Sequence, residues 1–292
     1  MFDINVNLIL SQMVLGLVNG VFYAILSLGL AIIFGLLGVI NFAHGVFFML
    51  GAFLAYLLAT WLGVGYWGAF VIVPLAVGAL GLVVEVLLIR QLYRLDHLYG
   101  LLLTLGLALA IEGLIRIVFG PQGLPYAVPP SLRGTISLGF MVLPIYRAWV
   151  VVAGIVLCVA TWYLIERTPL GAKLRAATDN PRLVQAFGIN VPIMLTLTYA
   201  AGVALAGLGG VMAAPIMSVD PSMGTNIVII VFAAVVIGGM GSISGAIVTG
   251  LGLGLIEGVT KAVFPQASST VIFVAMVIVL LLRPRGLFGK MA

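Results

Sequence analysis

The chain has 292 residues, of which 63% are hydrophobic and only 7% are charged. A soluble domain carries about 25% charged residues, so this chain cannot cover a water-facing surface and is predicted to be an integral membrane protein. The formal net charge of +5 then bears on membrane topology. No basic stripe interleaved with exposed aromatic residues is found, which argues against a nucleic-acid partner.

Nine apolar segments follow one another along the chain, and a helix needs about 20 such residues to cross the hydrocarbon core. They cover residues 8–37, 46–62, 67–89, 98–118, 149–165, 193–214, 226–239, 243–263 and 269–282. The first is long for one helix, with Gly29 and Gly35 as candidate break points, and the seventh is short enough to be re-entrant. We expect an all-α polytopic membrane protein of eight or nine transmembrane helices, forming one domain over residues 1–292.

Basic residues predict the orientation in the membrane, because they collect on cytoplasmic loops. They follow the third segment, fill the loop at about residues 167–191, and recur after the last segment: Arg90 and Arg94; Arg167, Lys173, Arg175 and Arg182; Arg283, Arg285 and Lys290. We therefore expect these three regions and the C-terminus in the cytoplasm. The proline-rich loop at about residues 120–147 is then outside, as a compact lid with a short amphipathic piece, although Arg133 opposes this mildly.

Small residues recur every four positions on two of the predicted helices. The two rows are Ala246, Gly250, Gly254 and Gly258, and Gly202, Ala206, Gly210 and Ala214. Small side chains at this spacing let helices approach closely in lipid, so both rows predict tight helix packing.

Residues 169–192 form the only long polar segment between apolar blocks. Asn180 is a good N-cap residue, Pro181 suits the first helical position, and Gly188 suits the left-handed position after a helix. The pattern predicts one short helix in the middle of the segment. Our hypothesis is that this helix docks on a partner outside the membrane.

Two polar or glycine-rich interruptions, near residues 38–51 and 238–250, are typical of broken helices. Corresponding broken segments in the two halves of a transporter mark the transport pathway. For Asn41 and His44 the alternative is a satisfied polar network at a helix end. The candidate pathway residues are Asn41, His44, Gly45, Gly239, Gly241 and Ser242.

Charged residues within or near the apolar segments are interpreted chiefly as structural pairs, because a charge in lipid is costly unless it is paired or faces a cavity. The expected pairs are Glu85 with Arg90, Glu112 with Arg116 and Glu257 with Lys261. The alternative is a role in the pathway. The sequence contains no P-loop, no His-Glu-x-x-His and no Gly-x-Ser-x-Gly motif, so we expect no catalytic residue, no metal site and no nucleotide site.

Two stretches resemble a known family. Residues 26–56 read LSLGLAIIFGLLGVINFAHGVFFMLGAFLAY, and residues 171–191 read GAKLRAATDNPRLVQAFGINV, followed by AGVALAGLGGVMAAP and VIGGMGSISGAIVTG. They resemble LivH-type permease subunits of the branched-chain (hydrophobic) amino acid ABC importers, over nearly the whole chain. The resemblance implies the ABC importer permease fold in the cytoplasmic (inner) membrane of a bacterium or archaeon.

The resemblance also implies partners and roles. A LivM-type permease, two cytoplasmic ATPase subunits that bind ATP and Mg²⁺, and a periplasmic or lipid-anchored binding protein would assemble with this chain among membrane lipids; the chain itself would carry no cofactor. Leu183, Val184 and Phe187 would fill an ATPase groove, with Arg182 and Gln185 making polar contacts. Asn180, Pro181 and Gly188 would shape this coupling helix.

The substrate implied by the resemblance is a branched-chain or other hydrophobic amino acid. Relatives of the same family for urea, amides or aromatic compounds remain alternatives. A stand-alone secondary transporter or channel is a competing class, and a membrane enzyme is a third.

Overall fold

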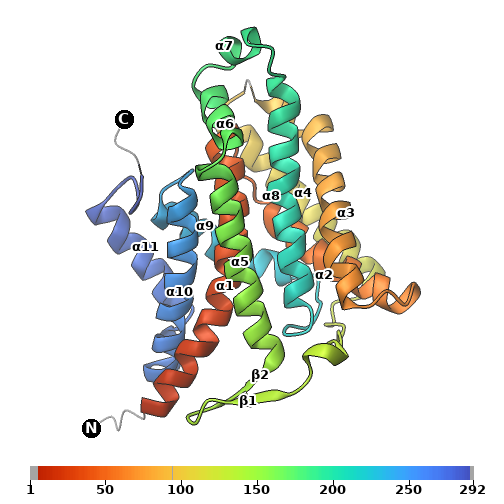
Figure 1. Ribbon diagram of the computed structural model, residues 1–292, viewed down its shortest axis with the longest axis vertical. Helices are drawn as coiled ribbons and strands as arrows, with labels where there is room; N and C mark the ends of the chain where they lie inside the picture. The colour runs from red at the N-terminus through yellow and green to blue at the C-terminus, as the bar shows by residue number, and fades with distance from the viewer. Residues whose placement is uncertain (1–5, 94, 290–292) are drawn as a thin grey trace.

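The computed structural model describes residues 6–93 and 95–289 (Figure 1). Arg94 and Lys290, which entered the orientation prediction, lie outside the described residues. The elements in chain order are α1 (Val6–Leu37), α2 (His44–Trp61), α3 (Tyr66–Leu87), η1 (Ile89–Leu92), α4 (His97–Phe119), η2 (Pro130–Leu132), β1 (Thr135–Ser137), β2 (Val142–Pro144), α5 (Ile145–Glu166), α6 (Pro169–Asp179), α7 (Pro181–Ala186), α8 (Val191–Ala213), α9 (Met223–Gly238), α10 (Ile243–Val263), η3 (Pro265–Ala267) and α11 (Thr270–Leu282).

Each of the nine predicted apolar segments is a helix, which confirms the expected all-α polytopic fold. In the part of the chain that the structure describes, seven helices are long and apolar enough to cross a membrane. The shorter apolar helices are α9, with 16 residues, and α11, with 13. The predicted break at Gly29 or Gly35 is wrong, because α1 continues to Leu37.

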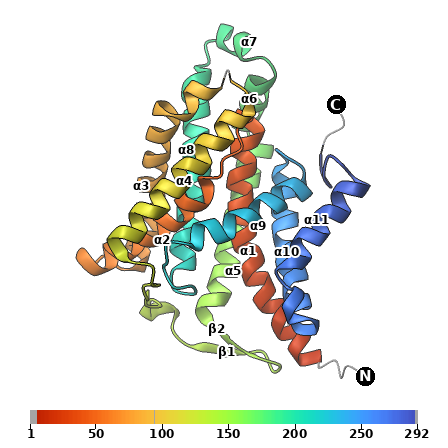
Figure 2. The same cartoon turned by 180° about the vertical axis from the view of Figure 1, so that it is seen from behind.

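The helices form a bundle with two distinct ends (Figure 1). We call the end that carries α6 and α7 the α7 end, and the opposite end, where β1 and β2 lie, the hairpin end. α1 is buried without a break from Gly20 to Ile33, whereas few residues of α4 are buried. From behind, α9 lies obliquely across α1 (Figure 2).

Close packing of α1 against α10 confirms the first row of small residues. A Cβ atom at Gly20 would lie 2.9 Å from the carbonyl oxygen of Leu251, and one at Gly250 would lie 2.5 Å from Cα of Ala24. Because no side chain larger than hydrogen fits there, the two backbones touch directly. Gly29 is a glycine for the same reason. It faces the backbone of Gly202 on α8, where a side chain has no space, and α1 continues through it as a helix.

The loop at residues 120–147 is held against the bundle at the hairpin end. Leu124 and Val219 exchange backbone hydrogen bonds of 2.9 and 3.0 Å. The ordered pieces are the 3-10 turn η2 and the antiparallel hairpin β1–β2, which pairs Ile136 with Leu143. Gly139, at φ +83°, makes the turn possible. The loop is compact as predicted, and its ordered piece is mainly a hairpin.

Candidate functional site

The polar segment predicted to hold one short helix folds as two, α6 and α7, which meet at Asn180. The Asn180 side chain accepts a hydrogen bond from the backbone N–H of Leu183 at 3.0 Å, and Pro181 opens α7. Gly188 has φ +82°, a conformation that favours glycine. The predicted capping of α7 is therefore confirmed. α6 was missed, although Pro169 after Thr168 was a usable signal for a helix start.

The tip of α7 presents apolar side chains to the exterior. Leu183 is 54% exposed and Phe187 is 77% exposed. They are four positions apart, a spacing that places side chains on one helix face. Arg182 and Gln185 are also exposed. Figure 1 shows α7 as the outermost element of its end of the bundle. This tip is a contact surface of two large apolar groups bordered by polar ones.

Val184 differs from its neighbours on α7. It is 6% exposed and packs in a small apolar cluster with Ala177 of α6 and Val191 of α8. The sequence interpretation placed Val184 on the docking face with Leu183 and Phe187, but here it points back into the protein. Val184 therefore anchors α7 to the helices on either side of it.

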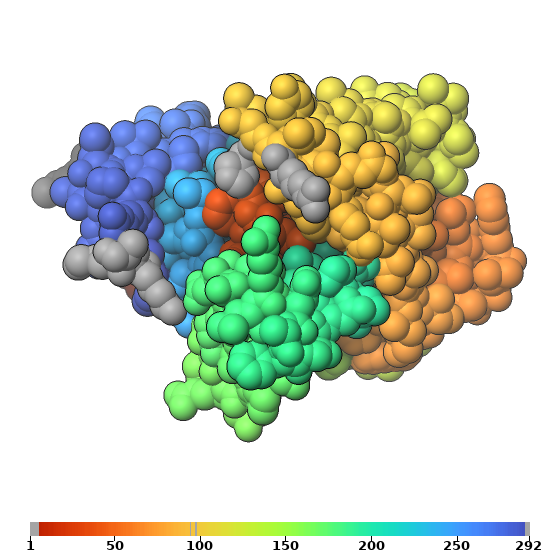
Figure 3. All heavy atoms as spheres, turned by 90° about the horizontal axis from the view of Figure 1, so that it is seen from above, coloured from red at the N-terminus to blue at the C-terminus, as the bar shows by residue number. Residues whose placement is uncertain are grey.

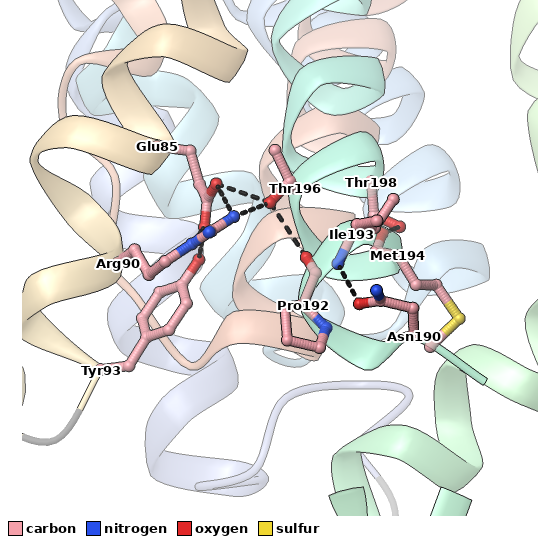
Figure 4. A network of polar contacts seen from close by, with 9 residues as sticks. All are labelled: Glu85, Arg90, Tyr93, Asn190, Pro192, Ile193, Met194, Thr196 and Thr198. Atoms are coloured by element: carbon pink, nitrogen blue, oxygen red, sulfur yellow. Dashed lines mark hydrogen bonds and ion pairs between the residues drawn. The ribbon is translucent and has the colours of Figure 1, made fainter. Parts of the chain in front are cut away.

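A buried carboxylate lies at the same end of the bundle. Glu85 of α3 is fully buried, and its carboxylate accepts hydrogen bonds from Arg90 at 3.1 Å and from Tyr93 and Thr196 at 2.7 Å each. Arg90 also donates to the Thr196 hydroxyl, so all four side chains converge (Figure 4). A buried charge is tolerated when it is paired and hydrogen-bonded in this way. The predicted Glu85–Arg90 pair is confirmed, and we call the four residues the Glu85 cluster.

The Glu85 cluster joins α3 and η1 to the first turns of α8. Burial raises the pKa of the Tyr93 phenol, and its hydrogen bond to the Glu85 carboxylate raises it further, so Tyr93 is the donor in that bond. On α8, Asn190 caps the helix by accepting from the N–H of Ile193 at 3.2 Å. Thr196 is one turn further on, so the cluster lies close to the attachment of α7 (Figure 4).

The first predicted interruption separates α1 from α2. Asn41 is buried there and donates a hydrogen bond of 3.0 Å to the Tyr199 hydroxyl, while its Oδ1 has no hydrogen-bond partner among the described residues. His44, which begins α2, is fully buried. Gly45 faces the first turn of α9, where an added Cβ would lie 2.7 Å from Cβ of Val228. Neither ring nitrogen of His44 has a hydrogen-bond partner among the described residues, so the Asn41–Tyr199 bond does not form the satisfied network of the alternative interpretation.

The second predicted interruption is the turn between α9 and α10. Gly239 and Gly241 have φ angles of +100° and +85°, and Ser242 caps α10 by accepting from the N–H of Gly245 at 3.1 Å. Gly241 and Ser242 line a cavity of about 420 Å³, which Glu166 and Arg175 also line. Seen from the α7 end, the end of α1 is recessed between α6–α7 and the C-terminal helices (Figure 3).

The structure does not bring the six predicted pathway residues into one site. Gly45 packs against the first turn of α9, at Gly224, whereas Gly239 follows its last turn. With 16 residues at about 1.5 Å each, α9 separates Gly45 from Gly239 by about 24 Å. Asn41 lies nearer to the turn at Gly239, because Ile40 and Met240 line one small pocket and Phe42 stacks on Phe232 of α9.

The other two predicted ion pairs have different outcomes. Arg116 and Glu112 form theirs, at 2.7 Å, as the four-residue spacing predicts. Glu257 and Lys261 do not pair within the described chain; instead the Tyr23 hydroxyl donates to Glu257 at 2.7 Å. The prediction of a Glu257–Lys261 pair is wrong, because α1 presents a closer partner that lies 234 positions away in sequence.

Long apolar helices packed through small residues, with a capped helix projecting at one end, define a polytopic membrane protein. Within residues 6–93 and 95–289, no three His, Cys, Asp or Glu side chains could together hold a metal ion.

Residues 12–281 match the family described as "Branched-chain amino acid transport system / permease component", and the chain belongs to that family. It is therefore a permease and not an enzyme, and permeases of this family carry no cofactor. The family confirms the resemblance on which the sequence interpretation relied.

Three curated relatives illustrate the similarity. The high-affinity branched-chain amino acid transport system permease protein BraD of Pseudomonas aeruginosa is 29% identical, over 96% of both chains. The corresponding protein LivH of Escherichia coli is 27% identical, again over 96% of both. LivM of the same organism is 27% identical over 91% of this chain and 67% of its own. No solved structure matches this chain.

Proposed function

We propose that this chain is the LivH-type half of a heterodimeric permease that imports branched-chain or other hydrophobic amino acids. A LivM-type permease, two cytoplasmic ATPase subunits and an external binding protein complete the transporter. Support for this assembly comes from similarity to LivH, BraD and LivM, whose names describe permeases of branched-chain amino acid transport. The lack of a P-loop in the sequence agrees with hydrolysis on separate subunits.

The observation that carries the proposal is the exposed tip of α7. Leu183 and Phe187 project at the α7 end, where α6 carries Lys173 and Arg175 and α7 carries Arg182. The positive-inside rule then puts the α7 end and the C-terminus in the cytoplasm. There, Leu183 and Phe187 enter a groove on an ATPase, and Arg182 and Gln185 make polar contacts at its rim.

ATP-driven closure of the ATPases moves α7 and switches the permease between outward and inward access. α7 transmits this movement because it is held on both sides: Val184 packs on α6 and α8, and Asn180 caps the helix. Beyond the Asn190 cap, the movement reaches the Glu85 cluster, which ties the start of α8 to α3.

The test is ATP-dependent uptake of L-leucine by proteoliposomes that contain the chain with its LivM-type permease, ATPases and binding protein. Phe187→Asp places a charge in the proposed apolar contact, and we expect uptake to fall at least about tenfold. Leu138→Asp is the matched control at the hairpin end, where Leu138 is 40% exposed. That variant should keep the ATPase subunits bound on co-purification, as the unmodified protein does, because the hairpin end faces away from the ATPases.

Unchanged uptake by Phe187→Asp would exclude α7 as the coupling helix. If urea, amides or aromatic compounds are transported in place of leucine, the proposed mechanism stands and the proposed substrate is wrong. Gradient-driven uptake by the chain alone, without ATPases, would instead indicate a secondary transporter.

A further inference from the structure

A second cavity, of about 210 Å³, lies at the hairpin end between α1, the start of α5 and the last turns of α10. Three charged side chains line it: Arg147 from α5, and Glu257 and Lys261 from α10. Leu15, Val18 and Ile216 add apolar surface to the same cavity. It therefore combines both signs of charge with an apolar wall.

The two cations of this cavity are Arg147, which is partly buried, and Lys261, which is exposed. In the described part of the chain, neither makes an ion pair or a side-chain hydrogen bond. Charged groups near the membrane are usually paired unless they face a cavity or a pathway. Arg147 and Lys261 keep their hydrogen-bond donors available in a cavity that also contains a carboxylate.

Glu257 is held in place by the packing of α10 on α1. The glycine contacts bring the two helices together, and the Tyr23 hydroxyl donates to one oxygen of the Glu257 carboxylate at 2.7 Å. A carboxylate offers about four acceptor positions, so one such bond orients Glu257 and leaves capacity for a second donor. The Glu257 carboxylate is thus oriented by Tyr23, while the donors of Arg147 and Lys261 stay available to a ligand.

We propose that this cavity binds a hydrophobic α-amino acid as a zwitterion, with Glu257 receiving the ammonium group and Arg147 and Lys261 receiving the carboxylate. Leu15, Val18 and Ile216 contact the apolar side chain of the amino acid. Charge-assisted hydrogen bonds at both ends make recognition strict, because an analogue that lacks either group leaves a charge unpaired. The inference rests on the proposed function, in which the hairpin end faces the side of entry.

The test measures equilibrium binding of tritiated L-leucine to the assembled permease–ATPase complex in nanodiscs, without the binding protein. We expect Glu257→Gln and Lys261→Gln each to weaken leucine binding at least about tenfold, as loss of a charged hydrogen bond implies. 3-Methylbutylamine and 4-methylpentanoate, which lack the carboxylate and the amine respectively, should not compete. Glu257→Asp and Lys261→Arg, which keep the charges, should retain most of the affinity.

Arg133→Gln is the matched control, since Arg133 lies at the same end and, among the described residues, bonds only to the backbone of Val128. It should bind leucine as the unmodified complex does, and retained ATP hydrolysis shows that each variant is assembled. Equal leucine affinity in all variants, or no leucine binding by the unmodified complex, would overturn the proposal. So would co-purifying phosphatidylethanolamine that only the charge-removing variants lose, because the cavity would then be a lipid headgroup site.

The outcomes separate this inference from the proposed function. If the unmodified transporter carries leucine with ATP while the cavity variants bind normally, only the cavity assignment fails. If no ATP-dependent leucine transport occurs at all, the proposed function fails first.

Discussion

The contact of α1 with α10 and the contact of α3 with α8 hold helices together in different ways. Between α1 and α10, glycines bring one backbone directly onto the other, and the Tyr23–Glu257 hydrogen bond adds to that contact. Between α3 and α8, Gly81 and Gly207 meet valine side chains of the opposite helix. A fully buried carboxylate there collects hydrogen bonds from Arg90, Tyr93 and Thr196 (Figure 4). Close-packed backbones have no side chain that can rearrange, whereas a polar cluster can exchange partners. We infer a fixed framework around α1 and α10, and a responsive contact beside α7.

The largest effect is expected from a bulky side chain in the fixed framework. In Gly254→Leu the new Cβ would overlap the backbone of Gly16 and Gly20, so the helices cannot meet and no folded protein should reach the membrane. Membrane yield and size-exclusion profile measure this. Gly252→Leu is the control on the same helix, where an added Cβ meets nothing within 4 Å, and it should fold normally. Equal yields of the two variants would refute the rigid-framework account.

A smaller loss is expected from Glu85→Ala in the responsive contact. It removes the acceptor shared by three donors, and we expect the free energy of unfolding to fall by about 2 kcal/mol, since Arg90 is 40% exposed and keeps some hydration. Thermal unfolding in detergent measures the change. Glu166→Ala is the control: Glu166 lies 3.5 Å from Arg175 and both are well exposed, so its loss should cost about 0.5 kcal/mol or less. Equal losses of unfolding free energy in the two variants would show that the Glu85 cluster stabilises the protein no more than an exposed ion pair does.

The smallest effect is expected from Asn180→Ala, which removes the cap of α7 without touching the bundle. A lost N-cap costs about 1 kcal/mol, enough to fray a six-residue helix. Amide hydrogen exchange should become faster over residues 181–186, and leucine transported per ATP should fall. Asn180→Asp keeps an acceptor at the cap and should behave as the unmodified protein. Unchanged exchange in Asn180→Ala would mean that the cap does not stabilise α7.

Local patterns in the sequence were sufficient to predict much of this structure. The length of each apolar segment predicts a membrane helix, because a segment in lipid must form its backbone hydrogen bonds internally. Asn180, Pro181 and Gly188 define α7, because capping depends on residues only a few positions apart. The Glu112–Arg116 pair follows from its spacing within one helix.

Features that depend on distant segments could not be predicted in this way. Gly29 resembles a helix break in sequence, but it is the place where α8 approaches α1. Val184 resembles a docking residue, but Ala177 and Val191 bury it. Glu257 resembles a partner of Lys261, but Tyr23 reaches it across the bundle. In each case the deciding contact comes from another helix, and it cannot be predicted from the spacing of residues along one helix.

The most direct test of the account is a cross-link from the tip of α7. Phe187→Cys places a thiol at a position that is 77% exposed, while the native Cys158 is buried and should not compete. With a maleimide–benzophenone reagent, the thiol adds to the maleimide and the irradiated ketone inserts into a C–H bond of whatever protein touches it. The assembled transporter should give a cross-link between position 187 and an ATPase subunit, and Leu138→Cys at the hairpin end should give none. A cross-link to the ATPase from position 138, or none from position 187, would contradict the assignment of α7 as the coupling helix.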